Sequence, residues 1–110
     1  MPKNRSMTRE NTGKPKLSYI LDFPNSNAEV SRVLEMGADK YSRHNWKDGA
    51  PMTEIMDSLM RHLTAFHNGE DIDEESGQSH MAHVICNANF ILENYYIHGT
   101  DIDDRDDRCL

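Results

Sequence analysis

Apolar residues recur every three or four positions in three stretches of this chain, between residues 26 and 41, 51 and 68, and 79 and 98. Side chains at this spacing share one face of an α-helix. The pattern predicts three amphipathic helices with short connections. It therefore predicts an all-α fold, a compact bundle of three main helices that an extended N-terminal segment precedes.

Capping and turn residues indicate where the first two helices begin and end. A capping box is expected to start the first helix at Ser26, with Glu29 reaching back to the free amide. Pro51 suits the first turn of the second helix, and Gly69 is expected to end that helix. Residues 42 to 50 are expected to form a loop that contains the only tryptophan.

The third helix is expected to begin after a cap at Ser76 or Ser79 and to end at Gly99. Its apolar arc comprises Met81, Val84, Ile85, Ala88, Ile91, Leu92 and Tyr95. A polar band borders this arc and consists of His80, His83, Asn87 and Asn94. Because buried polar groups need partners, another polar group must face this band. We expect His62 of the second helix to face the two histidines across the bundle.

The ends of the chain differ from this helical region in composition. We expect a flexible basic arm over residues 1–12, the helical domain over residues 13–99, and a mobile acidic tail over residues 100–110. The apolar run from Leu17 to Phe23 lies between two prolines and is expected to be extended and packed on the domain.

Composition and charge narrow the function classes. A net charge of −7 argues against non-specific binding to nucleic acid, whose phosphates would be repelled. No apolar run approaches the roughly 18 residues of a membrane span, and no signal peptide is recognisable. Cys86 and Cys109 suggest no disulfide framework, so a cytoplasmic location is expected. Three helices bury little apolar surface on their own, so we expect a homodimer or higher homo-oligomer. The functional site could then lie between subunits.

The candidate chemistry is a cluster of acids and histidines. The turn before the third helix carries Glu70, Asp71, Asp73, Glu74 and Glu75. Such acids beside histidines are typical of a divalent metal or phosphate site. Glu35 and Asp39 share a face of the first helix, which is either a solvated charged face or a carboxylate pair for a metal. Alternatively, the histidines and Asn87 only bond one another across a core.

An ordered set of short motifs carries a family resemblance. The motifs are Gly13-Lys14-Pro15, Gly37-Ala38-Asp39-Lys40-Tyr41, Asn45-Trp46, Arg61-His62-Leu63, Gly69-Glu70, Asp73, Glu75-Ser76-Gly77, His80, Ala82-His83 and Asn87. Over roughly residues 13 to 98, the chain resembles the phage-associated dATP/dGTP diphosphohydrolase N-terminal domain family. That family is similar in outline to the MazG-like all-α nucleotide pyrophosphohydrolases. These enzymes bind magnesium through acidic pairs on two helices and cleave a nucleoside triphosphate to monophosphate and pyrophosphate.

The resemblance implies a nucleoside triphosphate ligand in a phage or prophage setting, and thus a bacterial host cytoplasm. Where the MazG-like pattern has an acidic pair, this chain has His80 and His83. Either the metal differs from magnesium, or the turn supplies the acids, or the histidines bind phosphate. The expected cofactor is a divalent metal, Mg or Mn, with Zn or another transition metal as the alternative.

These considerations assign expected roles. The expected catalytic residues are Glu70, Asp73, Glu75 and His62. The expected substrate-binding residues are Lys14, Lys40, Tyr41, Asn45, Trp46, Arg61 and Asn87, although Tyr41 and Trp46 are equally interpretable as core anchors. The expected metal ligands are Glu75, His80, His83, Glu35 and Asp39. The predicted function is metal-dependent hydrolysis of a (deoxy)purine nucleoside triphosphate to monophosphate and pyrophosphate. A non-catalytic nucleotide-binding module and a helical interaction protein are the alternatives.

Overall fold

The regular elements of the described part of the chain are all helices, as the sequence predicts. The structure, a computed structural model, describes residues 6–105. Its elements are η1 (Leu17–Asp22), α1 (Pro24–Lys40), η2 (Asn45–Asp48), α2 (Met52–His67), α3 (His80–His98) and η3 (Gly99–Ile102), where η denotes a short 3₁₀ helix. Residues 6–105 contain no β-strand, only an isolated bridge between Ile72 and Ser79.

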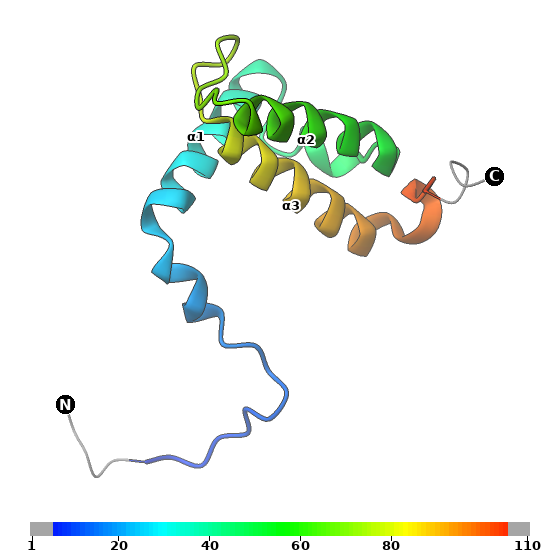
Figure 1. Cartoon of the computed structure of the whole chain (residues 1–110). Coiled ribbons are helices and arrows are strands. Elements are labelled where there is room, and N and C mark those ends of the chain that lie inside the picture. Colours follow the sequence, from blue (N-terminus) through cyan, green and yellow to red (C-terminus); the bar gives the residue numbers. More distant parts are fainter. Residues whose placement is uncertain (1–5, 106–110) are drawn as a thin grey trace.

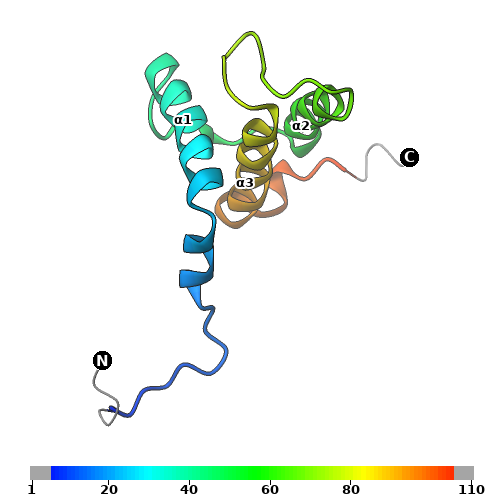
Figure 2. The same ribbon diagram turned by 60° about the vertical axis from the view of Figure 1, so that its left-hand side comes forward.

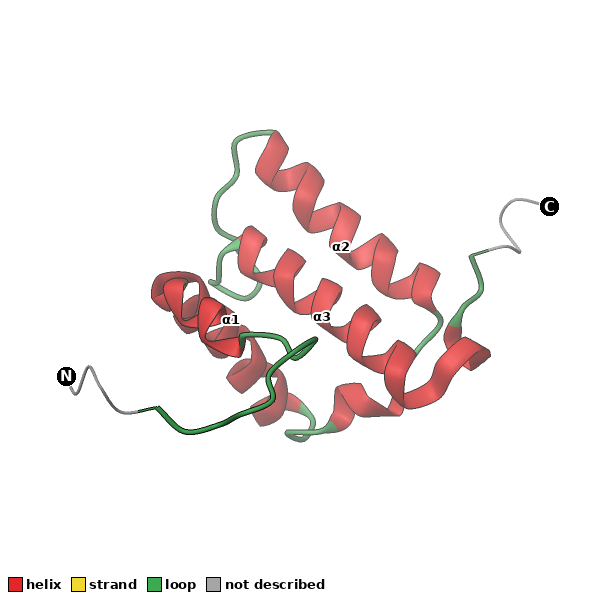
Figure 3. Cartoon of the chain, turned by 90° about the horizontal axis from the view of Figure 1, so that it is seen from below, coloured by secondary structure: helices red, strands yellow, loops and turns green. Residues whose placement is uncertain are grey.

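Helix α3 is the centre of the helical body. It lies between α1 and α2 and contacts both (Figure 3). The chain N-terminal to α1 projects away from this body (Figures 1 and 2). The radius of gyration is accordingly 18.0 Å, whereas about 13 Å is typical of a compact domain of this length.

The apolar core is small and joins α1 to α3. Val30 and Val33 of α1 pack against Ala82 and Cys86 of α3, and the half-buried Phe90 packs against this cluster. The small side chains of Ala82 and Cys86 allow the two helices to approach closely. Burial in this cluster raises the pKa of the Cys86 thiol to about 11, so Cys86 is a structural residue.

The buried face of α3 contains its polar band rather than the predicted apolar arc. His80 and Asn94 are buried, whereas Leu92 of the arc is 63% exposed. The band finds polar partners inside, because the Asn87 side-chain amide donates to Ser58 Oγ and the Asn94 side-chain amide donates to the Trp46 carbonyl. These hydrogen bonds satisfy the amide nitrogens, whereas the buried Asn94 Oδ1 has no hydrogen-bond partner among the described residues.

Two predictions for the N-terminal region are wrong. Residues 17–22 form a 3₁₀ helix instead of an extended segment, and their apolar side chains are exposed instead of packed on the domain. Helix α1 begins at Pro24, ahead of Ser26, and no side chain caps it. Proline at the first helical position has no amide to satisfy and a backbone angle suited to the helix, so the capping box is not used.

The predicted ends of α2 and α3 are confirmed. Pro51 immediately precedes α2, and Gly69 follows its end with a φ of 96°, which favours glycine. Ser79, rather than Ser76, caps α3, because its hydroxyl accepts from the amides of Met81 and Ala82 at 3.1 and 3.3 Å. Gly99 ends α3 with a φ of 63°.

The first part of the acidic tail is ordered against α2, contrary to the predicted mobility. After η3, the Asp104 carboxylate accepts from the Thr53 amide at 3.0 Å and from its hydroxyl. Thr53 lies in the first turn of α2, so a residue distant in sequence caps that helix. The remaining predictions for residues 1–5 and 106–110 lie outside the described residues. Among residues 6–105, no helix combines the length and hydrophobicity that crossing a bilayer requires.

Candidate functional site

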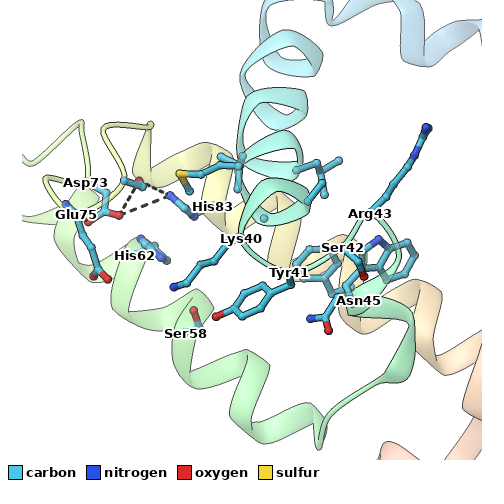
Figure 4. A pocket seen from close by; sticks show the side chains of 18 residues that line it. Lys40, Tyr41, Ser42, Arg43, Asn45, Ser58, His62, Asp73, Glu75 and His83 are labelled. Atoms are coloured by element: carbon cyan, nitrogen blue, oxygen red, sulfur yellow. Dashed lines mark hydrogen bonds and ion pairs between the residues drawn. The ribbon is translucent and has the colours of Figure 1, made fainter.

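A cavity of about 570 Å³ opens between the C-terminal end of α1, η2, α2 and the acid-rich turn before α3 (Figure 4). One part of its wall is aromatic and basic and contains Lys40, Tyr41, Arg43, Asn45 and Trp46. Another part is acidic and imidazole-rich and contains His62, Asp73, Glu75, Ser76 and His83. This volume falls in the range of small-molecule sites. We call these two parts the aromatic end and the histidine end.

A tight turn places Ser76 at the histidine end. The Asp73 amide donates to the Gln78 carbonyl at 2.8 Å, and the Gly77 amide donates to the Asp73 carbonyl at 2.7 Å. Gly77 has a φ of 73°, which a residue with a Cβ adopts only with strain. The turn thus folds back on itself and directs Ser76 and Asp73 toward α3.

Ser76 links Asp73 to His83. Its hydroxyl donates to Asp73 Oδ2 at 2.8 Å, and Ser76 Oγ also lies 2.8 Å from His83 Nε2 (Figure 4). Because the hydroxyl proton points to the carboxylate, Oγ accepts the proton that His83 carries on Nε2. His83 Nδ1 then holds a lone pair. Burial raises the pKa of Asp73, but the hydrogen bonds from Ser76 and the Glu75 amide outweigh burial and leave this pKa below its ordinary value.

Three histidines meet beside this turn, which confirms that His62 faces His80 and His83. His62 Nδ1 and His80 Nδ1 lie 2.9 Å apart and share a hydrogen bond. The His62 ring stacks on the His83 ring with centroids 4.2 Å apart. Desolvation and the neighbouring imidazoles lower the pKa of both His62 and His83, which favours their neutral forms.

The aromatic end is built on a stacked pair. The rings of Trp46 and Phe90 have centroids 5.4 Å apart and planes inclined by 22°. Trp46 therefore anchors η2 to α3 and lines the cavity at the same time. The ammonium of Lys40 lies 5.3 Å from the Tyr41 ring centroid, so a cation and an aromatic ring are presented together.

The cavity brings together only part of the predicted site. Eight predicted residues line it: His62, Asp73, Glu75, His83, Lys40, Tyr41, Asn45 and Trp46. Seven do not line it: Glu35, Asp39, Lys14, Arg61, Glu70, His80 and Asn87.

The seven residues lie elsewhere for different reasons. Glu35 and Asp39 are exposed on α1, which matches the alternative of a solvated charged face. Lys14 is exposed on the projecting N-terminal segment, and Arg61 is exposed on α2. His80 and Glu70 lie behind His62, and Asn87 is engaged with Ser58.

Other lining residues were not predicted as site residues, among them Arg43, Ser58, Ser76 and Phe90. Ser58 lies four positions before His62 and thus on the same helical face, which was an available signal. The sequence singled out Ser76 as a possible helix cap and as part of the Glu75-Ser76-Gly77 motif, but assigned it no role in the site. Its actual role depends on how the turn closes, which no periodicity reveals.

The donor set fits a magnesium ion that arrives with phosphates better than a metal held by protein alone. Among residues 6–105, no group of three or more His, Cys, Asp or Glu side chains is placed to hold a metal ion. Mg²⁺ is usually held by one or two carboxylates together with substrate phosphates and waters. Asp73 and Glu75 line the cavity and supply two such carboxylates. Both ring nitrogens of His80 are already hydrogen-bonded, so this arrangement leaves it no free donor.

A family model described as "dATP/dGTP diphosphohydrolase, N-terminal" matches residues 4–105. The chain belongs to this family. It is also 38% identical over 80 residues to a protein named dATP/dGTP diphosphohydrolase from Salmonella phage PMBT28. The match covers 73% of this chain but only 27% of that relative, so this member of the family spans a minor part of the relative's length. No solved structure matches the chain.

Proposed function

We propose that this protein binds a purine deoxynucleoside triphosphate in the cavity and hydrolyses it, with a divalent metal, to monophosphate and pyrophosphate. The observation that carries the proposal is the two-ended cavity, which opposes an aromatic, cationic wall to a wall of carboxylates and neutral histidines. The family membership and the printed name of the phage relative support the same substrate class.

Each end of the cavity suits one part of a nucleotide. Trp46 and Tyr41 offer aromatic surface to the base. The Lys40 side chain extends toward His62 and Ser58 (Figure 4), where it would offset phosphate charge. Asp73 and Glu75 would hold Mg²⁺ or Mn²⁺, with Zn²⁺ as the alternative that His83 Nδ1 would favour. When bound, the metal would supply positive charge to the phosphates and make a water more acidic.

A nucleotide-binding module without catalysis is the second candidate. The chain matches 27% of the length of its phage relative, so residues needed for turnover could belong to another part of such a protein. An interaction bundle is the third candidate, and the internal pairing of Asn87 with Ser58 is the feature that favours it.

One assay separates these candidates. Deoxynucleoside triphosphates are incubated with Mg²⁺, Mn²⁺ or Zn²⁺, and pyrophosphate and monophosphate are quantified. We expect metal-dependent release of both products, a reduction of at least about tenfold in Asp73→Asn, and near-normal activity in Asp39→Asn, an exposed control outside the cavity. Thermal stabilisation by nucleotide without turnover would support a binding module. If the protein shows neither turnover nor stabilisation by nucleotide, only the interaction bundle remains as a candidate.

We also propose that the protein is a homo-oligomer in the bacterial host cytoplasm. Five apolar side chains of residues 17–23 are at least 57% exposed: Leu17, Tyr19, Ile20, Leu21 and Phe23. Leu92 and Tyr96 on the outer face of α3 are also exposed, so one copy carries both an apolar projection and an apolar surface. Residues 1–16 contain five Lys or Arg and one Glu, whereas the rest of the chain contains seven basic and eighteen acidic residues. The projecting segment of one copy therefore complements the body of a second in charge.

The oligomer is tested by light scattering coupled to gel filtration. We expect a mass of at least twice 12.7 kDa for the wild type and a shift toward monomer in Leu21→Glu. Thr64→Glu is the control, because Thr64 is an exposed polar residue of α2. A monomeric wild type at all concentrations would contradict the proposal, and another occupant would then have to cover these apolar side chains.

A further inference from the structure

A line of hydrogen bonds runs from the exposed turn, through a buried histidine, to the wall of the cavity. Glu70 Oε2 lies 3.1 Å from His80 Nε2, and His80 Nδ1 lies 2.9 Å from His62 Nδ1. His80 is only 5% exposed. Of these three residues, only His62 lines the cavity.

The chemistry of the groups determines the direction of each hydrogen bond. An ionised carboxylate only accepts, so His80 carries its proton on Nε2 and donates it to Glu70. A neutral imidazole has a single N–H, so Nδ1 of His80 is an acceptor and His62 must donate from Nδ1. His62 Nε2 is then left with a lone pair. In the described part of the chain, no hydrogen bond occupies that atom.

We propose that Glu70 and His80 are positioning residues that hold His62 in the Nδ1–H tautomer, so that its Nε2 acts as the base in hydrolysis of the bound nucleotide. This inference rests on the proposed function for its catalytic part. The His83 ring stacks on His62 at an interplanar angle of 4° and thereby restricts the tilt of the His62 ring plane. The hydrogen bond thus sets the rotation of the ring in its plane, and the stack sets the plane itself.

In the proposed step, His62 accepts a proton from the water that attacks the nucleotide. A water oxygen forms a bond to the α-phosphorus, and one proton of that water moves to His62 Nε2. The bond from the α-phosphorus to the oxygen that bridges to the β-phosphorus breaks, and its electron pair leaves with pyrophosphate. His62 becomes an imidazolium, which still donates from Nδ1 to His80, and the Glu70 carboxylate at the other end of the line offsets its charge.

Nitrogen-15 NMR of the histidine rings tests the tautomer in nucleotide-free and metal-free protein. We expect the Nδ1–H tautomer for His62 in the wild type and a mixture of tautomers in Glu70→Ala. The control is Glu74→Ala, which removes the same charge from an exposed position in the same turn. Glu70 is a suitable site for substitution because its side chain is 61% exposed, so its loss leaves the core intact. An Nε2–H tautomer in the wild type, or no change in Glu70→Ala, overturns the proposal.

Steady-state kinetics test the catalytic part. We expect kcat to fall about tenfold or more in Glu70→Ala, with KM within about twofold, because the base is misplaced while the substrate-binding wall is intact. Glu70→Gln should recover much of this loss, since its side-chain oxygen can accept the same hydrogen bond from His80. Equal kcat in wild type and Glu70→Ala overturns the positioning role. Absence of turnover in the wild type refutes the proposed function and the base role with it, whereas the NMR result is decided independently.

Discussion

The imidazole rings of His62 and His83 lie face to face, with centroids 4.2 Å apart and planes 4° from parallel. Burial lowers the pKa of each ring, and for His62 the proximity of His83 lowers it further. Placing a positive charge on one ring would add repulsion to this desolvation cost. The pair is therefore arranged for two neutral imidazoles, and this property has consequences for stability as well as for chemistry.

The first prediction concerns stability at mildly acidic pH. Both folded-state pKa values are lowered from the ordinary value of 6.5, so below that value the unfolded chain binds protons that the folded chain does not. The resulting stabilisation is fully present above about pH 6.5 and declines as the pH falls through the folded-state pKa values. We expect the Tm, measured with EDTA, to fall between pH 7.5 and 5.0. His62→Gln should flatten this dependence, and His67→Gln, at an exposed position, should not.

The second prediction concerns the hydroxyl of Ser76. Its hydrogen bond is the main favourable interaction that lowers the pKa of Asp73. In Ser76→Ala we expect this pKa to rise above its wild-type value, as followed by carboxyl carbon NMR during a metal-free pH titration. Ser76→Thr keeps a hydroxyl and should stay close to wild type. An unchanged titration in Ser76→Ala would show that another group stabilises the carboxylate.

The third prediction concerns the cap that Asp104 places on α2. Removing it in Asp104→Ala frees the Thr53 amide and hydroxyl, and should lower the free energy of unfolding by about 1 kcal/mol. Asp101→Ala removes a neighbouring exposed acid and is the matched control. Urea denaturation at pH 7 provides the measurement. Equal losses in the two variants would indicate a general charge effect instead of a cap.

The fourth prediction concerns the stacked pair of Trp46 and Phe90. Phe90→Ala removes ring contacts from the core and from the wall of the cavity, and should destabilise the protein by about 2 kcal/mol, since this side chain is half-buried. Phe90→Leu should cost about 1 kcal/mol, because the volume is largely kept and only the stacking is lost. Fluorescence of Trp46, the only tryptophan, reports both the unfolding and the local change. A wild-type stability in Phe90→Ala would mean that the stack does not support η2.

The number, type and approximate positions of the main helices follow from the sequence alone. Their ends at Pro51, Gly69 and Gly99 were also predictable, because they depend on the backbone chemistry of single residues. The meeting of His62 with His80 and His83 was predictable for a related reason. Two histidines in the polar band of one helix need partners, and the second helix offers an imidazole at a suitable position.

Tertiary packing decided which face of α3 is buried. Periodicity identifies an apolar arc and a polar band, but α3 has neighbours on two sides, and the partners for Asn87 and Asn94 come from α2 and η2. The polar band is therefore inside, and Leu92 and Tyr96 remain outside. The exposed conformation of residues 17–23 was equally beyond sequence reasoning, because hydrophobicity alone does not specify which surface, if any, covers a segment.

The residues of the site were likewise determined partly by the sequence and partly by the tertiary structure. The sequence by itself determined that acids and histidines gather around the start of the third helix, since they are neighbours along the chain. Only the tertiary structure decided that Glu35 and Asp39 lie outside the cavity, that Ser76 joins Asp73 to His83, and that His80 lies behind His62. The physical reason is that these relationships depend on the relative rotation of packed helices and on the closure of one turn, and neither is encoded by spacing along a single element.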